Sequence, residues 1–207
     1  MTPYKTVKSS ANDEFTEKKS RFIGYISPVC NEEEAVSFVN SIKKLHPSAR
    51  HNVYAYTVRD GNITRYSDDG EPQGTGGIPI LEVIKGNELC DCCIVVTRYF
   101  GGILLGTGGL SRAYSLGAQL AIKAGGIVKM QPCTVCVCNI EYNQYGILQN
   151  VLSAHSATVT DTEFNDNVNM EFYIATEMLN TLIADITEKT SGTVKTDIKE
   201  EKFLPVL

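Results

Sequence analysis

Apolar residues recur with two different periods in the first part of the chain, and the period predicts which segments are helices and which are strands. In residues 31–46 they recur every three or four positions, as on one face of a helix. Asn31 is placed to cap this helix, and Pro47 ends it. Alternation in residues 51–58 predicts a half-buried strand, and the apolar run in residues 92–100 predicts a buried one.

Two further patterns extend this arrangement. Residues 4–10 and 18–29 are predicted to be the two strands of one hairpin. Residues 110–126 have an apolar helical face and end in a pair of glycines, which readily terminate a helix. The glycine-rich residues before this helix are predicted to form a flexible turn that joins it to the strand ending near Phe100.

After residue 131 the order of elements becomes strand, helix, strand, strand, helix, strand, which is typical of the split β-α-β, ferredoxin-like fold. Fourteen of the 17 glycines lie between Gly61 and Gly126, so the composition also shifts here. We expect Pro132 to interrupt the pattern and mark a boundary. The sequence therefore predicts an α+β protein with two domains, residues 1–131 and residues 132–207.

The net charge of −5 hides a difference between these two domains. Residues 1–131 hold 15 basic and 13 acidic residues, a net charge of +2, whereas residues 132–207 hold 4 and 11, a net charge of −7. A polyanion would prefer the first domain, and a basic protein partner would fit the second. An excess of +2 supports a local basic patch and not the strongly basic balance of a dedicated nucleic-acid binder.

The sequence also indicates a compartment. No apolar run approaches the ~18–20 residues that span a bilayer, and residues 1–15 hold no apolar stretch that could act as a signal peptide. Seven cysteines, an odd number, favour reduced thiols over a disulfide scaffold. We therefore expect a cytoplasmic protein that does not contact membranes.

Two cysteine groups resemble metal ligands at first sight: Cys90, Cys92 and Cys93, and Cys133, Cys136 and Cys138. Each group lies in a strand pattern, where alternate residues face opposite sides of the sheet, so Cys133 does not share a face with Cys136. Zinc sites usually place their cysteines on tight turns. The sequence predicts no metal site and no cofactor.

Residues 98–114 hold five glycines between arginine and aromatic residues. Gly101 and Gly106 have the spacing of a phosphate-binding loop, but Thr107 and Gly108 stand where that loop needs Lys and Ser or Thr. Two interpretations remain open. The free N–H groups at the start of the following helix can receive an anion, or the glycines only permit positive φ and tight packing.

Three carboxylates crowd into four residues at Asp68, Asp69 and Glu71. Clustered acids can bind a divalent cation or act as general acids and bases, and His51 is a further acid/base candidate. Asp-Gly followed by Glu-Pro is also strong turn chemistry, and an arginine-rich surface could pair with these acids. Spacing alone favours a solvated turn.

These two stretches, "YSDDGEPQGTGGIPIL" and "VVTRYFGGILLGTGGLSRAYS", closely resemble the signature of the IMPACT/YigZ family, as do "KKSRFIGY" and "HNVYAY". The resemblance covers the first domain almost end to end. It implies an N-terminal domain like the second domain of ribosomal protein S-five and a C-terminal domain like a late domain of elongation factor G. Eukaryotic members of the family are regulators of translation, which implies a translation-related role.

Our leading hypothesis is a non-catalytic, translation-associated protein that binds RNA or a ribosomal site through the glycine-rich surface. Arginines would hold phosphates and exposed aromatic rings would stack on bases. The candidate residues are Lys19, Arg21, Arg98, Tyr99, Gly106, Gly108, Gly109, Arg112 and Tyr114. The acids Asp68, Asp69 and Glu71 would orient the arginines or hold a metal that bridges to phosphate.

The alternative hypothesis is an enzyme that acts on a nucleotide or a phosphorylated small molecule. It requires the three acids and His51 to converge on one concave pocket. A third hypothesis is a protein–protein adaptor that docks a basic partner on its acidic second domain.

Overall fold

The computed structural model describes residues 2–205, which fall into two compact units. The N-terminal unit consists of residues 4–129, and the C-terminal unit consists of residues 130–205 with residues 2–3. This division lies within strand β7 (Ile127–Ile140), two residues before the predicted boundary. Pro132 does not interrupt β7 as expected, because it lies inside the strand opposite Phe203.

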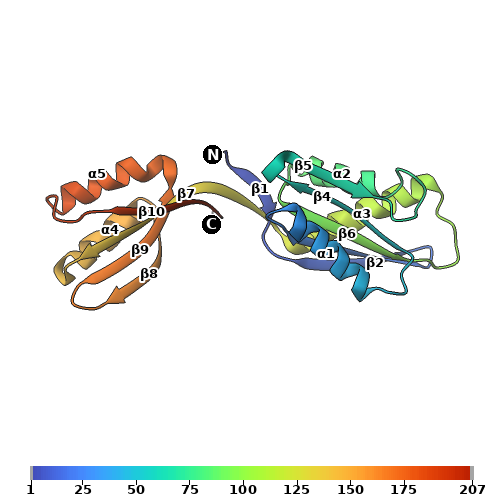
Figure 1. The fold of residues 1–207 in the computed structure, drawn as a ribbon, viewed down its shortest axis with the longest axis horizontal. Coiled ribbons are helices and arrows are strands. Elements are labelled where there is room, and N and C mark those ends of the chain that lie inside the picture. The colour runs from blue at the N-terminus through green and yellow to red at the C-terminus, as the bar shows by residue number, and fades with distance from the viewer. Residues whose placement is uncertain (1, 206–207) are drawn as a thin grey trace. The chain divides into compact units, whose positions relative to one another are not determined.

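An antiparallel five-stranded sheet forms the centre of the N-terminal unit, with the strand order β2-β3-β6-β4-β5. Its strands are β2 (Ala11–Glu17), β3 (Ser20–Pro28), β4 (His51–Val58), β5 (Ile63–Ser67) and β6 (Cys92–Tyr99). Helix α1 (Glu32–Leu45) covers one face, and α2 (Gly77–Gly86) and α3 (Thr107–Gly125) cover the other (Figure 1). A short 3₁₀ helix, η1 (Asp60–Asn62), joins β4 to β5.

Most predicted elements of this unit are confirmed. Strands β4 and β6 occupy the predicted residues, and β6 is buried except at Tyr99. Helix α1 begins as expected, because the Asn31 side chain accepts a hydrogen bond from the Glu34 backbone N–H at 2.8 Å. Helix α3 begins at Thr107, slightly before the predicted start.

The predicted hairpin of residues 4–10 with 18–29 is wrong. Strand β3 pairs with β2, from Ala11 opposite Ile26 to Glu17 opposite Ser20, whereas β1 (Tyr4–Val7) is hydrogen-bonded to β7. Strand β2 lies at the sheet edge and is mostly exposed, and only Ala11 and Phe15 pack on the core. It therefore lacks the apolar alternation that reveals a strand.

Helix α2 was not predicted, because its first turn holds glycine and Pro79, which are typical of turns. Proline is tolerated there, since the first N–H groups of a helix have no intrahelical partner. Ile80, Leu81 and Ile84 anchor the helix in the core against α3 and β4.

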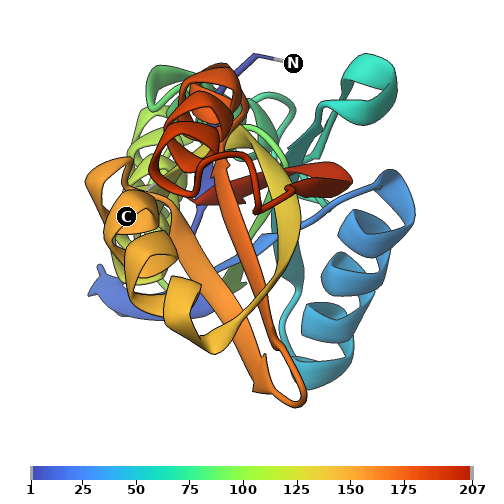
Figure 2. The ribbon, with the colours of Figure 1, turned by 90° about the vertical axis from the view of Figure 1, so that its left-hand side faces the viewer.

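The C-terminal unit has the predicted order of strand, helix, strand, strand, helix, strand. Its antiparallel strands β7, β8 (Thr158–Phe164), β9 (Val168–Ala175) and β10 (Asp197–Pro205) follow the order β10-β7-β9-β8. Helices α4 (Tyr145–Ala154) and α5 (Leu179–Lys189) lie together on one face (Figure 2), preceded by the 3₁₀ turns η2 (Tyr142–Gln144) and η3 (Thr176–Met178). The protein is thus a two-domain α+β protein.

The five buried cysteines pack as small apolar residues, whereas Cys30 is exposed and Cys90 is partly buried. Cys136 and Cys138 face the helices of the C-terminal unit, while Cys133 is buried outside that cluster. All seven cysteines are free, and residues 2–205 hold no group of three His, Cys, Asp or Glu side chains that could bind a metal ion. Within the same residues, no helix is both long and apolar enough to cross a membrane.

Candidate nucleic-acid interface

The two halves of the glycine-rich signature meet at one cavity in the N-terminal unit. This cavity has a volume of about 400 Å³. Glu71 and Pro72 line it from the first half, and Gly106 and Thr107 line it from the second. Arg98, near the end of β6, lines it as well. We call this the signature cavity.

A buried ion pair holds the two halves together. Arg98 Nη1 donates to Glu71 Oε1 at 2.7 Å, and the hydroxyl of Tyr114 donates to the same oxygen at 2.7 Å. The side chains of Arg98 and Glu71 are only 6% and 4% exposed. Burial, and then the charge of Glu71, raise the pKa of Tyr114, so that its hydroxyl stays protonated and donates.

Two expectations are corrected by this geometry. Tyr114 is fully buried, with its ring edge against Phe22, so it cannot stack on a base. Its place on the apolar face of α3 explains the burial. Arg98 is not an exposed phosphate contact, because its charge is neutralised inside the protein by Glu71.

One donor of Arg98 nevertheless remains free. Its Nε is the one buried side-chain nitrogen or oxygen in residues 2–205 without a hydrogen-bond partner. The guanidinium is flanked by the rings of Phe22 and Phe100, at 5.5 and 5.4 Å from their centroids. An unpaired buried donor destabilises a fold unless a ligand or water satisfies it.

Asp68 stabilises the start of α2. Its Oδ1 accepts from the N–H groups of Gly76 and Gly77 at 2.9 and 2.8 Å, and its Oδ2 accepts from Gly74 at 2.8 Å. Burial alone would raise the pKa of Asp68, but these three donors outweigh it and lower the pKa. Asp68 is therefore a helix cap supplied by the preceding loop.

Asp69 has other partners. Its Oδ1 accepts from Lys43 Nζ and its Oδ2 from the backbone N–H of Asn52, both at 2.7 Å. His51 bonds to the Asp69 backbone carbonyl at 3.0 Å. Of the three acids only Glu71 lines the signature cavity, together with His51. The convergence that the enzyme hypothesis requires is thus not found.

The N-terminus of α3 opens at the same cavity. Gly106 precedes the helix with φ +73°, a conformation that L side chains rarely adopt, and no side chain caps the helix. The N–H groups of Thr107, Gly108 and Gly109 lie in the first turn, where helices have no internal acceptor for them. They are donors that an anion can use.

Cationic residues line the two cavities beside this helix start. Arg50 lines the signature cavity, and Arg112 lines a neighbouring cavity of about 200 Å³ together with Lys18. Lys19 lies in the β2–β3 turn with φ +65°, and its backbone packs against Gly101. Arg21 forms an ion pair with Glu14 instead. Arg50, Lys19 and Arg112 are exposed.

Tyr99 does not line the signature cavity. Its neighbour in the sequence, Arg98, does, and successive strand residues face opposite sides of a sheet. The Tyr99 hydroxyl bonds to His46 Nδ1 at 2.8 Å, and His46 Nε2 bonds to the hydroxyl of Tyr25 at 2.7 Å. The aromatic ring that does line the cavity is that of Phe100, which is 49% exposed.

Seven residues that line the cavity were not among the predicted site residues: Arg50, Pro72, Phe100, Leu104, Leu105, Thr107 and Leu110. Leu104 is 82% exposed and Phe100 half exposed, although both lie in the quoted signature. The signal that could have identified Phe100 and Leu104 is an apolar run inside a glycine-rich turn. Apolar residues in a turn have no helical or strand face that would bury them, so they are left exposed.

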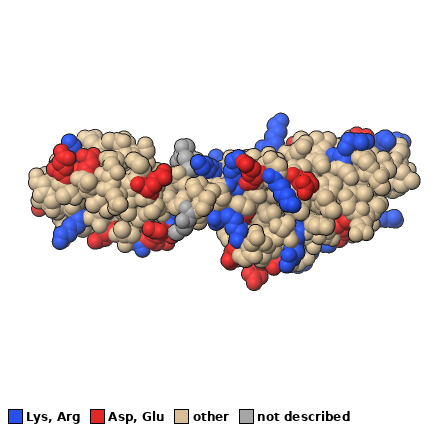
Figure 3. Space-filling model, turned by 90° about the horizontal axis from the view of Figure 1, so that it is seen from above, with Lys and Arg blue, Asp and Glu red and all other residues tan. Residues whose placement is uncertain are grey.

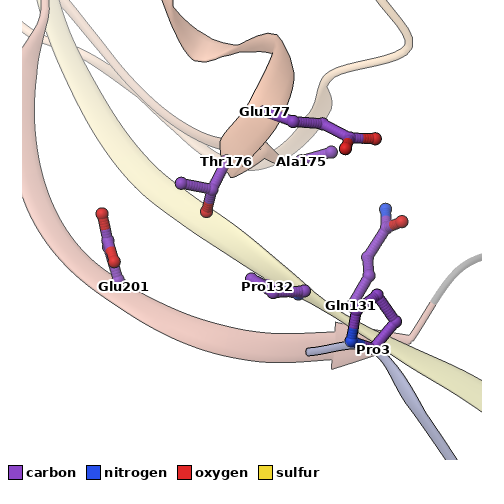
Figure 4. Close-up of a pocket in the computed structure, with 7 residues that line it drawn as sticks. All are labelled: Pro3, Gln131, Pro132, Ala175, Thr176, Glu177 and Glu201. Carbon is purple, nitrogen blue, oxygen red and sulfur yellow. The ribbon is translucent and has the colours of Figure 1, made fainter. Parts of the chain in front are cut away.

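The distribution of charged side chains bears on where an anion could bind. On the face shown in Figure 3, basic side chains of the N-terminal unit are interspersed with acidic ones. A third cavity, of about 320 Å³, lies in the C-terminal unit, where Glu177 and Glu201 flank Thr176 (Figure 4). Its charged lining residues are both acidic, so it does not suit an anion.

Known proteins resemble both units. The family model "Impact N-terminal domain" matches residues 18–122, and a "Domain of unknown function" model matches residues 138–193. IMPACT family member YvyE of Bacillus subtilis is 40% identical over 198 residues, with 95% of this chain and 90% of that protein covered. IMPACT family member YigZ of Escherichia coli is 32% identical over 181 residues, with 86% and 89% covered.

Two further matches are a eukaryotic protein and a solved structure. Protein IMPACT homolog of Dictyostelium discoideum is 40% identical over 96 residues, which cover 44% of this chain and 27% of that protein. A crystal structure described as that of a hypothetical protein has a TM-score of 0.62 and 29% identity, and the match covers 98% of this chain and 100% of that one.

Proposed function

This chain belongs to the IMPACT family, and we propose that it is a translation-associated cytoplasmic protein that binds RNA, free or in the ribosome, through the signature cavity and its rim. The translation-related part rests on the family, whose eukaryotic members the sequence resemblance identifies as regulators of translation. The expected likeness of both domains to domains of the translation machinery adds support by analogy.

One observation carries the RNA-binding part. The uncapped N-terminus of α3, the exposed Arg50 and the exposed ring of Phe100 surround a single cavity. Backbone N–H groups and arginines bind phosphates, and exposed aromatic rings stack on unpaired bases. The acids of the signature hold this arrangement in place.

The C-terminal unit has a different part in this proposal. Its net charge of −7 repels a polyanion, so RNA would be confined to the N-terminal unit. The same negative charge suits a basic protein, and we propose such a protein as a partner of the C-terminal unit.

The test measures the binding of single-stranded RNA to the full chain by fluorescence anisotropy at several salt concentrations. The double variant Arg50→Ala, Arg112→Ala should bind more weakly and lower the salt dependence of log K by about 1 for each lost phosphate contact. The control variant Lys85→Ala, Lys123→Ala removes two exposed charges from the last turns of α2 and α3. Equal weakening by both variants, or no RNA binding by the unaltered protein at low salt, would contradict the proposal.

A further inference from the structure

The signature cavity has the size of a site for a small molecule. Its volume of about 400 Å³ lies in the ordinary range of ligand pockets, roughly 300–1,000 Å³. Pro72, Phe100, Leu104, Leu105 and Leu110 give it apolar walls. A single base with its sugar fits such a space, whereas a stacked helix does not.

Neither the backbone conformation nor the packing around residue 108 requires glycine. It is the second residue of α3, its φ is not positive, and an added Cβ would meet only Arg112 Nη1, at 3.6 Å. Glycine in a helix is less stable than alanine by roughly 0.5–1 kcal/mol. The absent side chain leaves open space beside the free N–H groups, which a phosphate can occupy.

Two residues that line the cavity, Arg98 and Glu71, each have a polar side-chain atom without a hydrogen bond from the described residues. The Nε of Arg98 is buried without a partner. Both hydrogen bonds to Glu71 use Oε1, so Oε2 accepts none from the described residues. A nucleobase carries acceptors and amino donors on its edges, and it can satisfy such a pair.

We infer that the signature cavity takes one unstacked nucleotide of the RNA, with its phosphate on the N-terminus of α3 and its base between the apolar walls. This inference rests on the proposed RNA binding and specifies its ligand. The charges favour a nucleotide over an apolar peptide, because Arg50 and Arg98 face a single carboxylate in the lining. Single-stranded RNA supplies bases that can be turned out of the stack.

The test uses the full chain and two probes, a nucleoside 5′-monophosphate and inorganic phosphate, each competing with single-stranded RNA. The monophosphate should displace the RNA at a concentration at least about tenfold lower than phosphate alone, since base contacts worth about 1.4 kcal/mol give that factor. Displacement by both probes at the same concentration would overturn the nucleotide assignment and leave only an anion site.

The matched variants are Gly108→Ala and Gly146→Ala. Both glycines are the second residue of a helix, and neither Cβ would meet an atom within 3.4 Å. Gly108→Ala should weaken monophosphate and RNA binding about tenfold or more, because its Cβ would occupy the space that the phosphate needs, without lowering the melting temperature. Gly146→Ala should change neither affinity.

The outcomes separate the two proposals. If the unaltered protein binds RNA, but monophosphate does not compete and Gly108→Ala has no effect, the nucleotide site is refuted and RNA binding stands. If the protein binds no RNA at low salt, the proposed function fails, and the inference fails with it. Competition by a phosphoserine peptide as strong as that of the monophosphate would also overturn the nucleotide assignment.

Discussion

The buried Arg98–Glu71 ion pair should contribute strongly to the stability of the N-terminal unit, and its removal is the sharpest test of that contribution. Glu71→Ala would leave the guanidinium of Arg98 buried without a counter-charge and the hydroxyl of Tyr114 without its acceptor. Both charged side chains are more than nine-tenths buried, so solvent screens the pair little. Removal of one partner of such a pair typically lowers the free energy of unfolding by about 3–5 kcal/mol.

Glu71→Gln provides a graded comparison. The amide oxygen of glutamine can still accept from Arg98 and Tyr114, but without the charge that strengthens both bonds. We expect its loss of unfolding free energy to be smaller, about 1–3 kcal/mol. Urea denaturation of the full chain, monitored by tyrosine fluorescence and circular dichroism, measures the free energy of unfolding of both variants.

Glu88→Ala is the control for a surface pair. Glu88 is paired with Lys5 at the surface, where the two side chains are 75% and 45% exposed, so this variant should unfold like the unaltered protein. If Glu71→Ala unfolds within about 1 kcal/mol of the unaltered protein, the pair does not hold the signature together and our account of the cavity wall is wrong.

Two other groups of residues give checkable predictions. Asp68→Asn should destabilise α2, because its NH₂ group would replace an acceptor of backbone N–H donors. The pKa of Asp68 is lowered in the folded state, so its contribution is present above the unfolded pKa of about 4 and is lost as the pH falls through the folded value. The difference in stability between Asp68→Asn and the unaltered protein should therefore be large at pH 7 and shrink below pH 4, and an unchanged difference would refute the cap. Burial raises the pKa of Cys92 to about 12 and that of Cys90 to about 11, so a thiol reagent at pH 7 should modify Cys30, the exposed cysteine, before either of them. Mass spectrometry of the labelled peptides checks the order, and early labelling of Cys92 would contradict its burial.

Local patterns predicted the fold where the apolar period was strong. Helix α1 follows from its cap and period, and the C-terminal unit follows from its alternating runs. Strand β2 was missed because an edge strand with one solvated face can be almost wholly polar. Helix α2 was missed because its cap, Asp68, lies nine residues before its first residue.

The site was predictable only in part. The free N-terminus of α3 could be expected from a strand, a glycine turn and a helix. The burial of Tyr114 could also have been predicted, because Tyr114 belongs to the same apolar helix face as Leu110. The pairing of Arg98 with Glu71 was not, because it joins residues 27 positions apart through the sheet and gives no local signal.

The central claim is that RNA binds at the signature cavity, and amide NMR of the full chain during a titration with short single-stranded RNA tests it most directly. The account predicts that the largest shifts occur at the backbone amides of Thr107, Gly108 and Gly109 and at the side-chain Nε–H of Arg98. Shifts confined to the C-terminal unit, or to α1 on the opposite face of the sheet, would contradict it.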